Sequence, residues 1–227
     1  MQWIHDYDLF LFDFDGLLVN TEELHYRAYR KMCRGFGYDL DWDFQEYAEV
    51  AHVSSQGLRE EIYKKFPELA AKHPRWDDLY KEKTRNYLDL LNRGQVELMP
   101  GVEEFLHEVA KRHKKTCVVT NSSRRMVEAI IDRHPALQLI DLWVTREDYD
   151  KPKPDPECYV KAIEQFSADK ERAIGFEDSP RGLQALLGAE AAAVLITQIE
   201  YPSMEDLMDE RTKWFSSFHD LILSKRL

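Results

Sequence analysis

The chain has 227 residues and a formal net charge of −11, with 44% hydrophobic and 32% charged residues. This composition permits a sizeable core and excludes a disordered chain. The negative charge argues against unaided binding to nucleic acid or an anionic membrane, whose phosphates would be repelled. A basic signal segment, a long apolar run and paired cysteines are all lacking, so we expect a cytoplasmic protein.

Short apolar stretches recur along the chain and alternate with helix-like segments from Leu98 to the C-terminus. Such stretches, without polar alternation, are typical of strands buried on both faces of a parallel sheet. They run from Leu9 to Phe12, Thr116 to Val119, Leu142 to Val144, Ala173 to Phe176 and Ala192 to Ile196. The segment from Trp214 to Ile222 is expected to form a last helix on the sheet. The sequence therefore predicts an α/β fold with a Rossmann-like, doubly wound parallel sheet.

Residues from about 22 to 93 interrupt this alternation with helical patterns only. These patterns run from Glu22 to Arg34, Gly57 to Phe66 and Trp76 to Asn92. We expect residues 1–20 and 95–227 to form the Rossmann-like core and residues 21–94 to form an inserted α-helical cap domain. A ligand of an open α/β sheet lies at the carboxyl ends of the strands, so an insert after the first strand would cover it.

Two acids, Asp13 and Asp15, follow the first predicted strand and precede Gly16. Placing like charges close together costs free energy unless a cation offsets it, which favours a functional site. The alternative interpretation is an acidic hairpin turn at Asp15-Gly16. A calcium loop is excluded, because the later positions that would need acids hold apolar residues and a threonine.

Polar residues also follow three later strands. Thr120 and Asn121 offer donors for a phosphate oxygen, although they could equally cap the next helix. The Lys-Pro-Lys-Pro-Asp-Pro segment that begins at Lys151 holds a cation on a rigid backbone, and alone it is merely a rigid loop. The adjacent acids Glu177 and Asp178 could bind a metal, but alone they do not establish one.

The order and positions of these four segments resemble the haloacid dehalogenase superfamily of phosphotransferases, in its β-phosphoglucomutase and sugar-phosphatase branch with a small helical cap. The resemblance implies Asp13 as the nucleophile, Asp15 as the general acid and base, and Lys151 as the catalytic lysine. It also implies substrate or phosphate contacts from Thr120, Asn121, Gly16, His25 and Lys83.

The resemblance further implies Mg²⁺ as the cofactor. Mg²⁺ prefers oxygen ligands in near-octahedral geometry. The expected ligands are Asp13, the backbone carbonyl of Asp15, Glu177 and Asp178. Lys151 and the metal would supply three positive charges against four carboxylates, and a phosphate dianion would add further negative charge. A proton on Asp15, backbone N–H groups and the Thr120 and Asn121 donors would have to offset the remainder.

These features predict hydrolysis of a small phosphomonoester through an aspartyl-phosphate intermediate. The alternative is a sugar phosphomutase. Mutases of this branch resemble one another at a Gly-Val-Ser-Arg stretch whose arginine holds a distal phosphate, but this chain has His52-Val-Ser-Ser55. A non-catalytic phosphometabolite binder is a third possibility, and dehalogenation is disfavoured because it needs no Mg²⁺. We expect a monomer or weak homodimer.

Overall fold

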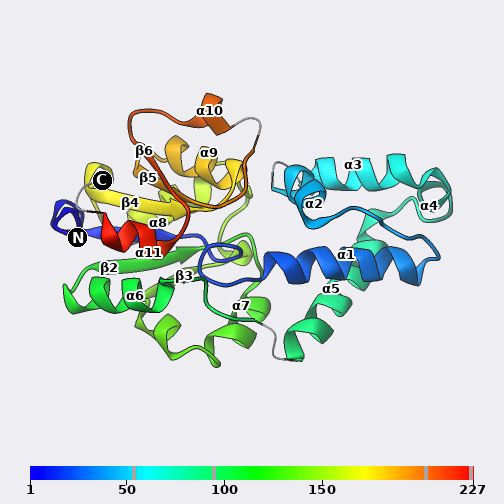
Figure 1. Cartoon of the computed structure of the whole chain (residues 1–227), viewed down its shortest axis with the longest axis horizontal. Helices are drawn as coiled ribbons and strands as arrows, with labels where there is room; N and C mark the ends of the chain where they lie inside the picture. Colours follow the sequence, from blue (N-terminus) through cyan, green and yellow to red (C-terminus); the bar gives the residue numbers. More distant parts are fainter. Residues whose placement is uncertain (53–54, 94–95, 202–203, 225–226) are drawn as a thin grey trace. The chain divides into compact units, whose positions relative to one another are not determined.

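The computed structural model describes residues 1–52, 55–93, 96–201, 204–224 and 227. The chain divides into two compact units. Unit 1 comprises Met1–Asn20 and Glu97–Leu227, and unit 2 comprises Thr21–Val96. Figure 1 shows that unit 1 carries the sheet whereas unit 2 is built from helices. Within the described ranges, every helix is too short or too polar to cross a membrane.

The described part of unit 1 contains a six-stranded parallel sheet with the order β3-β2-β1-β4-β5-β6. Its strands are β1 (Leu9–Phe12), β2 (Lys115–Val119), β3 (Leu142–Val144), β4 (Ala173–Glu177), β5 (Ala192–Ile196) and β6 (Thr212–Phe215). This is the strand order of a doubly wound sheet, with its direction of winding reversed between β1 and β4. The predicted fold class is therefore confirmed.

Helices cover both faces of this sheet (Figure 1). The α-helices of unit 1 are α6 (Val102–Lys111), α7 (Arg124–Ile131), α8 (Glu157–Gln165), α9 (Pro180–Gly188), α10 (Met204–Leu207) and α11 (Phe218–Leu223). Short 3₁₀ helices occur at η1 (Trp3–Asp6), η2 (Pro135–Leu139), η3 (Arg146–Asp148) and η4 (Lys170–Arg172).

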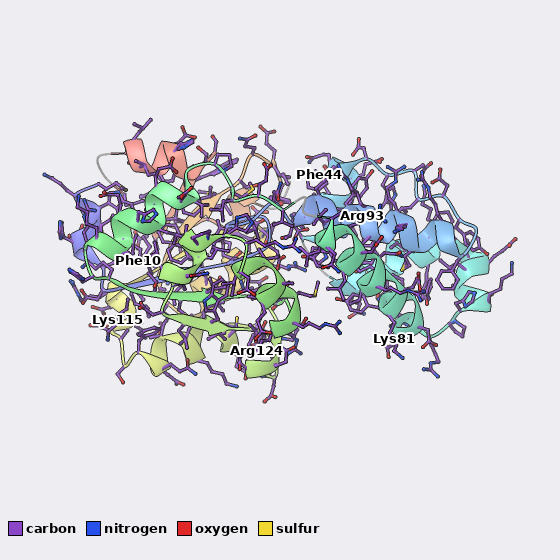
Figure 2. All side chains as sticks on the ribbon, turned by 90° about the horizontal axis from the view of Figure 1, so that it is seen from below. Phe10, Phe44, Lys81, Arg93, Lys115 and Arg124 are labelled. Atoms are coloured by element: carbon purple, nitrogen blue, oxygen red, sulfur yellow. The ribbon has the colours of Figure 1, made fainter. Side chains whose placement is uncertain are left out.

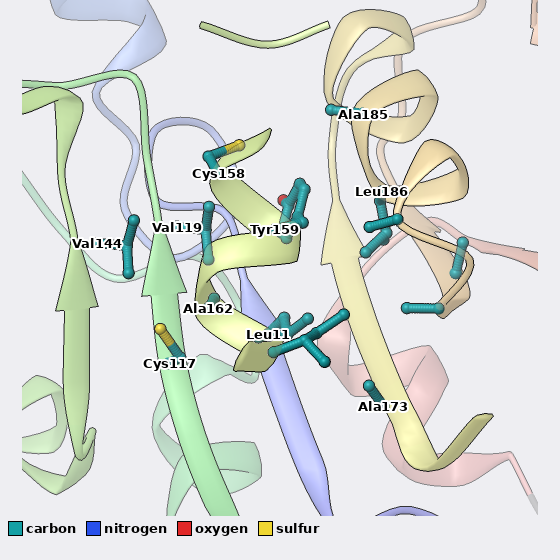
Figure 3. Packing of buried hydrophobic residues seen from close by; sticks show 14 of the residues in the cluster. Leu11, Cys117, Val119, Val144, Cys158, Tyr159, Ala162, Ala173, Ala185 and Leu186 are labelled. Carbon is teal, nitrogen blue, oxygen red and sulfur yellow. The ribbon is translucent and has the colours of Figure 1, made fainter. Parts of the chain in front are cut away.

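Alternate residues of β1 face opposite layers, as expected for a strand. Leu11 joins the cluster that α8 and α9 cover, where Figure 3 shows Tyr159 and Leu186 beside the strands. Gly175 of β4 admits this packing, because a Cβ there would lie 2.3 Å from Leu186 Cδ1. This tight packing against α8 and α9 fixes the positions of β1 and β4, and so of the residues that follow them.

The opposite layer is aromatic. Phe10, labelled in Figure 2, is fully buried and packs against Phe105 of α6. Phe12 stacks on Phe176 with ring centroids 5.1 Å apart, and Phe218 of α11 closes the cluster. The two layers hold β1 and β4 rigidly at the point where the predicted acids follow them.

Unit 2 has a core of its own, with clustered tyrosines that include Tyr26, Tyr29 and Tyr47. Its helices are α1 (Glu22–Gly35), α2 (Phe44–Ala51), α3 (Ser55–Lys65), α4 (Pro67–Lys72) and α5 (Trp76–Asn92). Two of these, α2 and α4, were not predicted. Local signals begin both: Asp43 and Glu46 form a capping box at α2, and Pro67 occupies the first turn of α4.

The C-terminal segment corrects a second expectation. Trp214 lies in β6, an edge strand paired with β5, and not in a helix. The last helix starts later, where the Ser217 side chain accepts a hydrogen bond from the Asp220 N–H. Phe218 and Leu221 of that helix are buried, as the prediction required.

Candidate active site

The carboxyl ends of β1, β2 and β4 meet at one edge of the sheet. The register aligns Phe12 with Val118 and Phe176, so the residues that follow these strands are neighbours. The Asp13 N–H donates to the Phe176 carbonyl at 3.0 Å, which extends the pairing by one residue. Most of the candidate site residues of unit 1 lie at this edge of the sheet.

A glycine turn places Asp15 beside the end of β2. Gly16 has a φ of +82°, a conformation that favours glycine, and its N–H donates to the Val19 carbonyl at 2.9 Å. Asp15 Oδ2 accepts hydrogen bonds from Thr120 Oγ1 at 3.2 Å and from Ser122 Oγ at 2.5 Å. Asp13, Asp15 and Thr120 are therefore brought together.

The lysine at this site is Lys153. Its Nζ donates to Asp13 Oδ1 at 2.5 Å, to Glu177 Oε1 at 2.7 Å and to the Val119 carbonyl at 2.7 Å. Its side chain is 3% exposed. The predicted lysine, Lys151, is instead 72% exposed, and its Nζ lies 3.8 Å from Asp155 Oδ2. The assignment of Lys151 to the position beside Asp13 is therefore corrected to Lys153.

A repeated sequence pattern explains this error. Lys-Pro-x-Pro occurs twice, beginning at Lys151 and again at Lys153, so sequence alone offers two equivalent frames. The fold selects between them. The Glu157 carboxylate accepts from the Lys151 N–H at 2.9 Å, and Asn121 Oδ1 accepts from the Lys153 N–H at 3.2 Å. These bonds fix the loop so that the second lysine enters the interior.

Two hydroxyls that the sequence did not single out support these groups. Tyr159 of α8 is fully buried, and its hydroxyl lies against Glu177 Oε1 and 3.0 Å from Lys153 Nζ. The Tyr149 hydroxyl lies 2.8 Å from the Thr120 carbonyl and 2.7 Å from Asn121 Oδ1. Tyr159 follows the apolar pattern of its helix, whereas Tyr149 stands alone between two aspartates, so no sequence motif marks either hydroxyl as part of the site.

Burial governs the electrostatics of the site. Burial, reinforced by Glu177 and Asp15 and opposed by Lys153, raises the pKa of Asp13 to about 8. Burial also disfavours the charge on Lys153, but Asp13 and Glu177 outweigh it and hold the Lys153 pKa well above its ordinary value. Asp13 would therefore need further positive charge beside it to stay ionised at neutral pH.

The acids of this site fit a hard cation. One carboxylate oxygen from each of Asp13, Glu177 and Asp178 lies within 4.8 Å of the others, and all three residues are buried. Glu177 Oε2 is buried and has no hydrogen-bond partner among the described residues. An oxygen donor set with an unsatisfied buried carboxylate oxygen is suited to Mg²⁺.

The predicted cap residues lie in unit 2 and contact each other. Lys83 Nζ is 2.5 Å from His25 Nδ1, and the His25 ring stacks on Tyr87 with centroids 4.3 Å apart. Of the stretch compared with the mutases, residues 53–54 and the side chain of residue 55 lie outside the described part of the chain. His52 is buried, and its Nε2 lies 2.9 Å from Glu22 Oε2.

Residues 10–196 match the haloacid dehalogenase-like hydrolase family. Protein CbbY of Cereibacter sphaeroides is 32% identical over 189 residues, which cover 79% of this chain and 79% of that protein. A phosphorylated carbohydrates phosphatase of Thermotoga maritima is 28% identical over 186 residues, which cover 79% of this chain and 80% of that protein.

A solved structure extends this similarity to nearly the whole chain. A point variant of CbbY from Rhodobacter sphaeroides, crystallised in complex with xylulose-(1,5)bisphosphate, has 27% identity and a TM-score of 0.76. The similarity covers 95% of this chain and 96% of that one. The chain belongs to the haloacid dehalogenase-like hydrolase family and is an enzyme of its phosphatase class.

Proposed function

We propose that this enzyme hydrolyses a small sugar phosphomonoester through an aspartyl phosphate on Asp13, with Mg²⁺ as its cofactor. The observation that carries the proposal is the pairing of Asp13 Oδ1 with buried Lys153 Nζ at 2.5 Å, next to Asp15. That bond fixes one oxygen of Asp13 and orients the carboxylate for attack by the other. A carboxylate held in this way can act as a nucleophile.

The two steps use Asp13 and Asp15 in turn. In the first, Asp13 attacks phosphorus, the bond to the ester oxygen breaks, and Asp15 gives its proton to that oxygen. In the second, Asp15 takes a proton from water as the water oxygen attacks phosphorus, and the bond to Asp13 breaks. Asp15 ends the cycle protonated and Asp13 ends it ionised.

The remaining polar groups are assigned to the phosphate and the metal. Thr120, the Asn121 amide and the backbone near Gly16 would hold the phosphate oxygens. The metal would be held by Asp13, Glu177, Asp178 and the backbone carbonyl of Asp15. When bound, Mg²⁺ supplies positive charge that keeps Asp13 ionised and stabilises negative charge on the transferring phosphoryl group.

Relatives support a sugar phosphate as the substrate class, since they include a phosphorylated carbohydrates phosphatase and a CbbY bound to a sugar bisphosphate. We propose unit 2 as the cap that selects the substrate, with His25 and Lys83 in contact with it. A cytoplasmic location and a monomer or weak homodimer also stay predictions. The two alternative functions, a sugar phosphomutase and a non-catalytic binding protein, are distinguished from hydrolysis by measuring phosphate release.

The test is phosphate release over a panel of sugar phosphates, nucleotides, phosphoglycolate and phosphorylated cofactors. Asp13→Asn should reduce turnover by roughly 10³-fold or more, because the amide is a poor nucleophile. Asp6→Asn, at an exposed acid of η1, should change nothing. Removal of Mg²⁺ with a chelator should stop turnover, and its return should restore it.

Three results would contradict the proposal. Undiminished turnover by Asp13→Asn would exclude the aspartyl phosphate. Conversion of a sugar phosphate to its isomer without release of phosphate would identify a mutase. Saturable binding of phosphorylated compounds without turnover of any of them would identify a binding protein.

A further inference from the structure

We propose that Tyr159 is a positioning residue, which holds the Glu177 carboxylate so that its Oε2 atom can bind the metal ion. This inference rests on the proposed function, since it takes Glu177 as one of the Mg²⁺ ligands. Tyr159 lies in the first turn of α8, 18 positions before Glu177. Its hydroxyl donates to Glu177 Oε1, and both side chains are fully buried.

Glu177 Oε1 receives two hydrogen bonds, and each has a proton of its own. The ammonium group of Lys153 has three protons, and its three shortest contacts are with Asp13 Oδ1, Glu177 Oε1 and the Val119 carbonyl, at 2.5, 2.7 and 2.7 Å. Its contact with the Tyr159 oxygen is longer, at 3.0 Å, and is not needed for this count. The single hydroxyl proton of Tyr159 goes to Glu177 Oε1.

These two donors make the two oxygens of Glu177 unequal. A carboxylate oxygen accepts about two hydrogen bonds, so Lys153 and Tyr159 fill Oε1. Oε2 is buried and lacks a hydrogen-bond partner in the part of the chain that the structure describes. A cation would also be repelled from Oε1, because the Lys153 ammonium lies 2.7 Å from it. Oε2 is therefore the oxygen of Glu177 that suits a metal ion.

Packing limits the freedom of this carboxylate to turn. A Cβ on Gly182 of α9 would lie 1.9 Å from Oε2, 2.1 Å from Cδ and 2.4 Å from Oε1 of Glu177, so the flat face of the carboxylate lies against that helix. The lone pairs in the carboxylate plane stay available for donors and a cation. The Tyr159 ring belongs to the buried cluster that Figure 3 shows, so its hydroxyl is presented from a fixed position.

The decisive measurement is the affinity for Mg²⁺. Tyr159→Phe removes the hydroxyl but keeps the ring, whose centroid lies 4.7 Å from Lys153 Nζ. Calorimetric titration of the metal-free enzyme with Mg²⁺ alone should give a Kd about 10-fold above that of the wild type, because a partner that orients a metal ligand is lost. The Mg²⁺ concentration for half-maximal phosphate release should rise by the same factor, while kcat at saturating Mg²⁺ stays within about threefold.

Tyr63→Phe is the matched control. The Tyr63 hydroxyl donates to a backbone carbonyl, that of His73 in unit 2, at 2.7 Å, so its removal should leave the Kd for Mg²⁺ unchanged. Glu177→Gln should weaken Mg²⁺ binding at least as much as Tyr159→Phe. In the double variant, Tyr159→Phe should add less than about a twofold further loss, since Tyr159 acts through Glu177. Urea unfolding without Mg²⁺ would establish that each variant folds.

Failure of this inference can be told from failure of the proposed function. An unchanged Kd in Tyr159→Phe, or a full further loss when it is added to Glu177→Gln, would overturn the role of Tyr159 alone. Absence of Mg²⁺ binding by the wild type would overturn the proposed cofactor and this inference with it. Wild-type affinity in Glu177→Gln would remove Glu177 from the metal site, with the same consequence for Tyr159.

Discussion

Each unit of the molecule buries a lysine, and the two lysines are held by different chemistry. In unit 1, Lys153 donates to two carboxylates, at 2.5 Å from Asp13 and 2.7 Å from Glu177. These acids cancel its charge. The attraction between these charges offsets the desolvation cost of burying the ammonium group. It also fixes the position of Asp13, the proposed nucleophile.

In unit 2, Lys83 is 2% exposed and lies among aromatic rings. Its Nζ is 5.0 Å from the Tyr29 ring centroid, 5.3 Å from that of Tyr87 and 2.5 Å from His25 Nδ1. Ring faces and an imidazole stabilise a cation without cancelling its charge. The comparison indicates that Lys153 holds acids in place, whereas the described contacts of Lys83 are with aromatic rings and an imidazole.

The largest expected effect follows removal of the core lysine. Lys153→Met would leave Asp13 and Glu177 buried without their cation, so we expect loss of turnover and, without Mg²⁺, a fall of about 3–5 kcal/mol in the free energy of unfolding. Lys151→Met, at an exposed position, should change that free energy by less than about 0.5 kcal/mol. Urea unfolding and phosphate release would measure both.

This pair of variants also tests the corrected assignment. Inactivation by Lys151→Met with full activity in Lys153→Met would restore the first Lys-Pro-x-Pro frame. It would also break the comparison between the two buried lysines.

The cap lysine should affect substrate binding more than stability. Lys83→Met should raise KM for a sugar phosphate by about 10-fold, because one charge-assisted contact is lost, while kcat for p-nitrophenyl phosphate stays within about twofold. Lys81→Met, at an exposed position of the same helix, is the matched control (Figure 2). An unchanged KM in Lys83→Met would show that this lysine serves only the folding of unit 2.

The smallest expected effect compares two helical glycines. A Cβ on Gly182 of α9 would lie 1.9 Å from Glu177 Oε2, so Gly182→Ala should displace that carboxylate and destabilise the protein by about 1–3 kcal/mol. Gly35 of α1 has nothing within 4 Å of a Cβ. Gly35→Ala should therefore stabilise by about 0.5 kcal/mol, as its helix propensity predicts.

Thermal and urea unfolding of both glycine variants would measure this contrast. A stabilising Gly182→Ala would mean that Glu177 can move away at no cost. The acid cluster would then be less rigid than the packing implies.

Local sequence patterns were sufficient to predict most strands and helices of the protein. The unbroken apolar stretches predicted five of the six strands in the described sheet, and the change to helical periodicity predicted the helices α1, α3 and α5. The acids at positions 13, 15, 177 and 178 were also visible, because residues that directly follow parallel strands must share one edge of the sheet. Trp214 was misassigned because a short edge strand with exposed residues has little periodicity to read.

Only the tertiary structure decided which groups touch. The sequence could not distinguish Lys151 from Lys153, because the Lys-Pro-x-Pro pattern begins at both residues. The hydrogen bonds of the two backbone N–H groups, to Glu157 and to Asn121, are what distinguish them. Nor could it find Ser122, whose partner Asp15 is 107 positions away. The sequence thus determined the elements and the edge where the acids gather. Packing and long-range hydrogen bonds, which depend on position in space, determined the lysine and the hydroxyls that complete the site.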